Sequence, residues 1–476
     1  MKSVFHSNSI IILFVVCISS RLLTSIDYIE DIDSLRFALS LDKYSLIEFQ
    51  PHFPGYPIFC FVAKMIFILI GNIGLTFSII GGLSVFFIIY FVLKICRIDL
   101  FSRSGIFCFI IIFFNPLIWL MSNRYMPDIM GLAIAIAGIY YLTNIDKKDK
   151  DVMIGFLLFG LLAGTRLSYL PLLFVPFLSV LIKSSNRVQL FSVFLLGCLV
   201  WLLPLVLLTG ITDLITVAGK QTLGHFSDFG GTAITENDWS IRMNNFVRSI
   251  WSDGLGGYWP ERSWVTIVLS LPMIYIGYYA TLNMVAILRK EHTWKMILFS
   301  LFVYTIWVFF FQNIIYKSRH ILPILVILLM FFTMGQNKMF TTVRMSSAMV
   351  VIFFISLIVV TSVLVSQHAK PTAVAKLKDS IINSTNKNTI ISIPLINYYL
   401  RENGVQANFI NIHKLDQLEI DRETKLNGAM VIGDFNEMFS SEFMIIPDTI
   451  FYHNPYMNRM WSSIETYTIV NKQYGK

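Results

Sequence analysis

The chain of 476 residues is 55% hydrophobic and only 14% charged, and its mean hydropathy is +0.67. This composition lies far from that of an ordinary soluble domain. The formal net charge of +8 does not indicate a nucleic-acid partner, because residues 367–476 hold 11 Lys+Arg and 11 Asp+Glu and are neutral. The positive excess lies in short loops between apolar runs, where the residues that orient a membrane protein are found.

Apolar runs follow one another through the first 366 residues. A helix that spans a bilayer needs roughly 20 apolar residues, and many of the runs approach that length. They occupy residues 9–23, 56–71, 74–93, 104–121, 129–143, 152–165, 167–182, 188–209, 264–288, 296–311, 321–334 and 345–366. The sequence therefore predicts an all-α polytopic membrane domain over residues 1–366.

The basic loops predict the orientation of these runs. They comprise residues 94–103, 146–150, 183–187, 289–295 and 338–344. Loops of this kind stay in the cytoplasm, and all of them can do so only if one early run does not cross. The run 56–71 is short, carries Lys64 and follows the turn "QPHFPGYP", so we expect an interfacial or re-entrant helix there.

About eleven spans then remain, with a cytoplasmic N-terminus. The first run could instead be a cleaved signal peptide, but no convincing small-residue cleavage site follows it. With eleven spans, the first outer loop (24–73), the long loop 210–262 and the polar tail 367–476 all lie outside the cytoplasm.

The tail, residues 367–476, has a different pattern from the rest of the chain. The β-like runs "NTIISIPL", "ANFINI" and "GAMVIGD" alternate with the helix-like "INYYLRENG". A strand–helix–strand pattern of this length predicts a small extracytoplasmic α/β domain.

Acidic residues are crowded into "SIDYIEDIDSLRFALSLDKY", just after the first apolar run. In an extended segment, Asp31 and Asp33 point the same way, so both carboxylates can face one site. The alternative is that Asp33 caps a helix that begins at Ser34. Carboxylates at a water–membrane boundary can deprotonate an acceptor hydroxyl or amine, or hold a divalent cation such as Mg or Mn. Asp31 and Asp33 are thus candidate catalytic and metal-binding residues.

A third acid, Asp128, lies in "SNRYMPDIMGLA" on the predicted outer side, close to Arg124. A helix N-cap beside Pro127 is the structural alternative, because the helix dipole favours an acid there. A second outer acid accompanied by a cation makes Asp128 a further candidate catalytic residue.

Outer cations accompany the acids. Arg166 lies in "AGTRLSYLP", Lys317 and Arg319 lie in "YKSRHILP", and His52 lies in "PHFPGYP". Arginine binds phosphate oxygens through two parallel hydrogen bonds, and lysine supplies a point charge. The alternative for each cation is a side chain that reaches toward lipid headgroups. Several of them on the side that carries the acids indicate a site for an anionic lipid headgroup.

The motifs together resemble a known family. "DSLRFAL" resembles the "D-E-x-R-Y-A" signature of GT-C type integral membrane glycosyltransferases, and "PHFPGYP" resembles the Pro-rich turn of their family-39 branch, which includes protein O-mannosyltransferases and aminoarabinose-lipid transferases. "RYMPDIMGL" resembles the second outer-loop acid motif of that branch. "LAGTRLSYLPLL" and "YKSRHILPILVILL" resemble its arginine-bearing span ends. The similarity covers roughly residues 10–335, in order.

The resemblance implies roles for individual residues. Asp33 matches the acid of the first outer loop, which acts as the base, and Asp128 matches the acid of the second. His52 takes the place of the cation on the phosphate side of the turn. Arg166 and Arg319 are weaker matches for headgroup contacts, with Lys317 beside them. Ser34 and Phe53 depart from the family pattern, in which Glu and Pro are expected.

The resemblance also implies an activity. Enzymes of this type take a sugar from a polyprenyl-phosphate carrier and transfer it to a lipid, glycan or protein outside the cytoplasm. A single displacement would invert the anomeric carbon. The compact chain favours the bacterial inner membrane. The alternatives are a flippase or transporter of lipid-linked sugars, a lipid-linked glycan polymerase or ligase, and a non-catalytic scaffold. The predicted spans carry no Asp or Glu, whereas transporters often place ionisable groups near the midplane.

Overall fold

The computed structural model describes residues 7–143, 148–227, 231–342, 346–384, 389–417 and 426–472. The chain divides into two compact units. The helical unit comprises Met1–Ile26 and Arg36–Ser366, and the sheet unit comprises Asp27–Leu35 and Gln367–Lys476. The acidic segment Asp27–Leu35 therefore packs with the tail, although all of the chain between them, Arg36–Ser366, belongs to the helical unit.

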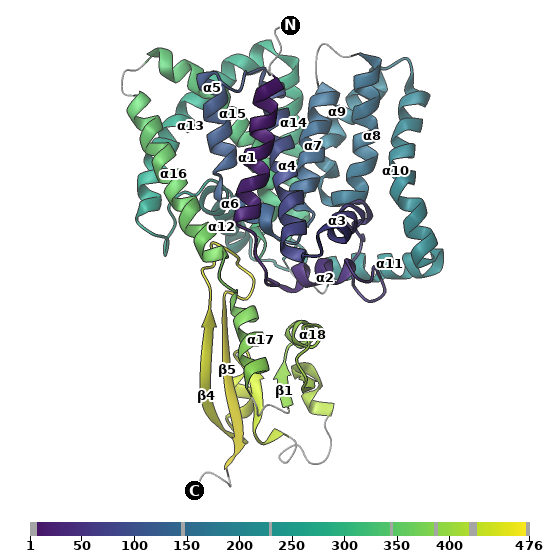
Figure 1. Ribbon diagram of the computed structural model, residues 1–476, viewed down its shortest axis with the longest axis vertical. Coiled ribbons are helices and arrows are strands. Elements are labelled where there is room, and N and C mark those ends of the chain that lie inside the picture. The colour runs from purple at the N-terminus through teal and green to yellow at the C-terminus, as the bar shows by residue number, and fades with distance from the viewer. Residues whose placement is uncertain are drawn as a thin grey trace. The chain divides into compact units, whose positions relative to one another are not determined.

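The helices of the first 368 residues are, in chain order, α1 (Ser7–Leu23), α2 (Ile32–Ser40), α3 (Pro57–Ile70), α4 (Ile73–Cys96), α5 (Arg103–Phe113), α6 (Pro116–Asn123), α7 (Asp128–Thr143), α8 (Asp149–Arg166), η1 (Leu167–Tyr169), α9 (Leu170–Lys183), α10 (Arg187–Thr209), α11 (Ile211–Ser227), α12 (Trp239–Arg248), η2 (Ser249–Gly254), α13 (Val265–Lys290), α14 (His292–Phe311), η3 (Ser318–Ile321), α15 (Leu322–Thr342) and α16 (Ser346–His368). Among them, α1, α4, α7, α8 and α10 form a row of neighbouring helices (Figure 1).

The helical unit is that of a polytopic membrane protein. Within the described residues, seven helical segments are long and apolar enough to cross a membrane, and the pair α5 and α6, bent by 55°, makes an eighth. Shorter apolar helices lie at Asn8–Leu23, Pro57–Ile70 and Asp128–Thr143. The 14 residues of α3 extend roughly 21 Å at 1.5 Å per residue, less than the roughly 30 Å of a bilayer core. The count of eleven spans and the non-crossing course of α3 stay predictions.

Small residues bring these helices close together. A Cβ atom on Gly160 of α8 would overlap the backbone of Phe194, Gly197 and Cys198 on α10. Helices in lipid gain little from hydrophobic burial against one another, so close packing over small residues is what holds them. The helix breaks matter for function, because α8 ends at Arg166 and a short 3-10 turn, η1, leads directly into α9.

The sheet unit holds a five-stranded sheet in the order β2-β1-β3-β5-β4. Its elements are α17 (Ala373–Asn383), β1 (Thr389–Ser392), α18 (Pro394–Glu402), β2 (Asn408–Asn411), η4 (Ile412–Gln417), β3 (Ala429–Ile432), α20 (Asn436–Phe439), β4 (Phe443–Tyr452) and β5 (Ser463–Asn471). Strand β1 is parallel to β2 and β3, whereas β5 is antiparallel to β3 and β4. The four residues of β3 are all buried, as a central strand requires.

The predicted α/β pattern of the tail is confirmed. The runs "NTIISIPL", "ANFINI" and "GAMVIGD" contain β1, β2 and β3, respectively, and "INYYLRENG" covers all of α18 except its first two residues. The sequence did not predict the long pair β4 and β5, drawn in yellow in Figure 1. The sequence of β4, "FMIIPDTIFY", is an apolar run broken by Pro447 and Asp448 and not an alternation of apolar and polar residues, so it lacks the period by which a half-buried strand is recognised.

Candidate functional site

The first candidate site lies in the helical unit and centres on Asp128, the first residue of α7. Its Oδ1 forms an ion pair with Arg166, lying 2.8 Å from Arg166 Nη2, and lies 3.9 Å from Arg319 Nε. All three side chains are buried. Taking charges out of water is costly, and an ion pair offsets that cost only when its geometry is good. The N-cap alternative therefore does not account for Asp128, whose carboxylate holds a cation from another helix.

The backbone around Arg166 places its guanidinium group. Arg166 ends α8 with φ −154 and ψ 83, outside the α-helical region, so the helix breaks at this residue before η1 begins. Gly131 on α7 makes room for it, because a Cβ there would overlap the Arg166 Cβ. The rings of Tyr56 and Tyr169 each lie 5.7 Å from the guanidinium carbon, a distance at which the ring face attracts a cation.

His52 reaches the same cluster through Tyr56. Arg166 Nη1 donates to the Tyr56 hydroxyl at 3.2 Å, and that hydroxyl lies 3.1 Å from His52 Nε2. Gly55 and Tyr56 both have positive φ, 87° and 46°, which turns the Tyr56 ring back toward His52. Phe37 packs edge-on against both rings. We call Asp128, Arg166, Arg319, Tyr56 and His52 the arginine cluster.

Arg319 enters the arginine cluster from η3. Its Nη1 lies 2.7 Å from Met126 Sδ, in the turn that precedes α7. The hydroxyl of Tyr304 donates to the carbonyl of His320 at 2.9 Å and fixes η3 in place. Lys317 lies at the N-cap of η3 and is half-buried.

The second candidate site lies in the sheet unit and contains the acidic segment. Glu30, Asp31 and Asp33 are all buried. Helix α2 begins at Ile32, and Asp31 Oδ1 accepts the backbone N–H of Ser34 at 2.8 Å. The alternative in which Asp33 caps a helix beginning at Ser34 is therefore wrong, because the cap is Asp31. Asp33 lies in the first turn of the helix that Asp31 caps.

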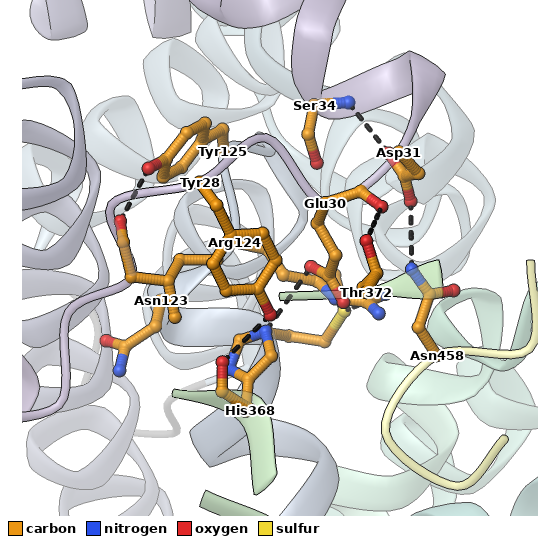
Figure 2. Close-up of polar contacts among 12 residues, drawn as sticks. Tyr28, Glu30, Asp31, Ser34, Asn123, Arg124, Tyr125, His368, Thr372 and Asn458 are labelled. Carbon is orange, nitrogen blue, oxygen red and sulfur yellow. Dashed lines mark hydrogen bonds and ion pairs between the residues drawn. The ribbon is translucent and has the colours of Figure 1, made fainter. Parts of the chain in front are cut away.

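The tail residues of the sheet unit hold this acidic segment (Figure 2). Asn458 Nδ2 donates to Asp31 Oδ2 at 3.2 Å, and Thr372 Oγ1 donates to the carbonyl of Glu30 at 2.9 Å. His368 Nε2 lies 3.4 Å from Glu30 Oε2. Tyr399 donates its hydroxyl proton to the carbonyl of Ile29 at 2.6 Å. Burial raises the pKa of the Tyr399 phenol, and the charges of Asp31, Asp379 and Glu30 raise it further.

The expected pairing of Asp31 and Asp33 on a metal ion does not fit the geometry of the described residues. No group of three or more His, Cys, Asp and Glu side chains in that part of the chain is placed to hold an ion. Both oxygens of Asp31 already accept hydrogen bonds, from Ser34 and from Asn458.

The sequence did not indicate the roles of two further buried residues of the helical unit. Tyr56 stood within the quoted motif "PHFPGYP", but nothing in the motif indicated that its hydroxyl links His52 to Arg166. Asp253 is a buried acid on η2, a π-helix that packs against η3. Such turns are rare and often mark functional sites, but no periodicity in "SDGLGG" indicates one.

Comparisons with known proteins bear on the fold. No protein-family model matches the chain, and no curated protein matches it. The solved structure of ArnT from Cupriavidus metallidurans bound to undecaprenyl phosphate is similar, with 12% identity and a TM-score of 0.52, over 97% of this chain and 98% of that one. Its apo structure gives 11% identity and a TM-score of 0.54 over the same shares.

An oligosaccharyltransferase from Archaeoglobus fulgidus, tethered through a disulfide to an acceptor peptide with the NVT sequon, is also similar. Its identity is 11% and its TM-score is 0.51, over 92% of this chain and 70% of that one. The chain has the GT-C fold. The family resemblance stated from the motifs is confirmed at the level of fold.

Within this GT-C fold, the structure brings together most of the residues that the sequence singled out in the helical unit. Asp128, Arg166, Arg319 and His52 meet in the arginine cluster: the two arginines contact Asp128 directly, and His52 is linked to Arg166 through Tyr56. Asp31 and Asp33 lie in the sheet unit with Asn458 and Thr372 from the tail.

Proposed function

We propose that this protein is a membrane glycosyltransferase that moves a sugar from a polyprenyl-phosphate donor to an acceptor outside the cytoplasm. The observation that carries the proposal is the buried arginine cluster, in which two guanidinium groups surround the Asp128 carboxylate within a GT-C fold. A buried set of N–H donors of this kind suits the phosphate of a lipid-linked sugar.

In the proposed reaction, the arginine cluster binds the phosphate of the donor lipid. Negative charge develops on the leaving phosphate as its bond to the sugar breaks, and fixed donors stabilise that charge without rearrangement. Asp128 engages one terminal nitrogen of Arg166 and Tyr56 engages the other, so the guanidinium plane has a fixed direction. Asp128 acts here as a positioning residue for Arg166, and Arg319, Lys317 and His52 supply further positive charge or donors.

In the proposed reaction, Asp33 is the general base that accepts the proton of the acceptor group. The acceptor hydroxyl or amine transfers its proton to the Asp33 carboxylate while its oxygen or nitrogen bonds to the anomeric carbon. The bond from that carbon to the phosphate oxygen breaks, and polyprenyl phosphate leaves with the electron pair. A single displacement inverts the anomeric centre. Asp31, as the cap of α2, fixes the helical turn that carries Asp33.

The test is transfer by purified protein in liposomes, with radiolabelled polyprenyl-phosphate sugars as donors and a membrane extract as the source of acceptors. The wild type is compared with Asp33→Asn and with Asp27→Asn, a matched control because Asp27 lies on the same segment and is exposed. We expect transfer by the wild type and the control, loss of turnover in Asp33→Asn, and an inverted product.

Two other results bear on the proposal. A retained anomeric configuration would overturn the single displacement. Consumption of no donor, together with movement of lipid-linked sugar across the vesicle membrane, would replace the transferase by a flippase. A chelator arm reports whether a divalent cation takes part. We further place the chemistry on the extracytoplasmic side of a bacterial inner membrane, which accessibility labelling of single cysteines in loop 24–73 can test.

A further inference from the structure

The acidic segment of the sheet unit is held residue by residue. Tyr28 donates its hydroxyl proton to the carbonyl of His368 at 2.8 Å. The carbonyl of Ile29, the carbonyl of Glu30 and the carboxylate of Asp31 accept from Tyr399, Thr372 and Asn458, respectively. Every residue from 28 to 31 thus bonds to the tail, more than 330 positions away in the sequence. These four hydrogen bonds from and to the tail hold the conformation of the segment.

Among these donors, Asn458 contacts a candidate catalytic carboxylate. It lies in the loop between β4 and β5, and its side chain is buried. Figure 2 shows Asp31 between Ser34 and Asn458. With Ser34 N–H on Oδ1 and Asn458 Nδ2 on Oδ2, both oxygens of Asp31 are directed.

The orientation of the Asn458 amide is itself determined. Its Oδ1 accepts the backbone N–H of Met460 at 2.9 Å, so the NH₂ group must face Asp31. The backbone is fixed as well. His453 Nδ1 accepts the N–H of Ala373, which leaves the ring proton of neutral His453 on Nε2, where it donates to the Asn458 carbonyl at 2.8 Å. Asn458 is therefore a pre-oriented donor.

We propose that Asn458 is a positioning residue for the transfer reaction, which makes the loop between β4 and β5 part of the catalytic apparatus. Its amide orients the Asp31 carboxylate, Asp31 caps α2, and the capped turn carries Asp33. The donor also stabilises a buried negative charge, since a hydrogen bond to an ionised group is about twice as strong as one between neutral groups. This inference rests on the proposed function and extends it to the tail.

The experiment is a charge swap across the Asn458–Asp31 hydrogen bond. Asn458→Asp sets two carboxylates against each other, and Asp31→Asn sets two amide donors against each other. The double variant restores one donor and one acceptor, and Asn caps a helix as well as Asp does. We expect kcat to fall about tenfold or more in each single variant, with the KM for the donor lipid unchanged, and to recover in the double variant.

The controls keep the outcomes distinct. Asn408→Asp changes an exposed asparagine of the same unit and should act as wild type. Thermal unfolding in detergent identifies any variant that fails to fold, and the double variant, in which the hydrogen bond is rebuilt, then decides. If wild type transfers sugar and Asn458→Asp has the same kcat, or if the folded double variant shows no recovery, the inference fails. If wild type transfers nothing, the proposed function itself fails.

Discussion

Arg166, the last residue of α8, forms an ion pair at 2.8 Å with Asp128, the first residue of α7, and both side chains are almost inaccessible to solvent. Removal of one member leaves a buried charge without its partner, which costs about 3–5 kcal/mol of stability. The pair therefore has a structural role and, in the proposed reaction, a catalytic one. The two roles call for different substitutions.

Arg166→Lys should retain a positive charge but lose the two-pronged contact with Asp128 and Tyr56. We expect transfer to fall by about 100-fold, because a displaced donor stabilises the leaving phosphate poorly. Asp128→Asn should lower the unfolding temperature as well as the activity. The matched control is Arg103→Lys at an exposed position. Equal activity of Arg166→Lys and wild type would remove Arg166 from the phosphate site.

Tyr56→Phe tests the link between His52 and Arg166. The variant retains the ring that packs against Phe37 but removes the hydroxyl that contacts both residues. A hydrogen bond to a charged group contributes about 1.5–3 kcal/mol, so transfer should fall by roughly tenfold or more. The measurement is kcat/KM for the donor lipid, with the exposed Tyr278→Phe as control. An unchanged value would show that Arg166 needs no orientation from Tyr56.

The sequence predicted the helical membrane domain and several members of the arginine cluster. The sequence alone shows polar residues beside apolar runs, and this contrast singled out Arg166, Arg319 and His52. Tyr56 was missed because its role depends on a left-handed backbone at position 56, which aims its hydroxyl at two side chains. Tyrosine beside a glycine gives no such signal by itself.

The acidic segment shows a second limit of sequence reasoning. Its four acids were evident, but its partners were not, because Asn458 lies 427 positions from Asp31. A contact between residues so far apart in the sequence depends on the tertiary fold of the sheet unit, and no local sequence pattern indicates it. The alternative that placed the helix start at Ser34, with Asp33 as its cap, was wrong. Two acids near a helix start, Asp31 and Asp33, can each cap it, and only the backbone conformation decides between them.

The phenol of Tyr399 predicts a dependence of stability on pH. Its pKa is raised in the folded state, first by burial and then by nearby carboxylates. An unfolded tyrosine ionises near pH 10. The stabilisation is therefore fully present below about pH 10 and is lost as the pH rises from that value through the raised pKa of the folded state. We expect unfolding in denaturant to become easier above about pH 10 in wild type, and less so in Tyr399→Phe. Parallel curves for the two proteins would contradict this assignment.

Gly131→Ala tests the placement of Arg166 without touching a charged or polar group. The added Cβ would overlap the Arg166 Cβ, so the end of α8 must shift relative to α7, and we expect the Arg166 guanidinium group to be displaced with it. Alanine favours a helix over glycine by about 1 kcal/mol, so α7 itself gains local stability. A loss of transfer therefore reports the displaced guanidinium rather than a weaker helix.

Gly219→Ala on α11 is the control, because a Cβ there meets nothing within 4 Å. We expect transfer to fall at least tenfold in Gly131→Ala and to stay at the wild-type value in Gly219→Ala. Full activity of a folded Gly131→Ala protein would show that the precise position of Arg166 does not limit the reaction.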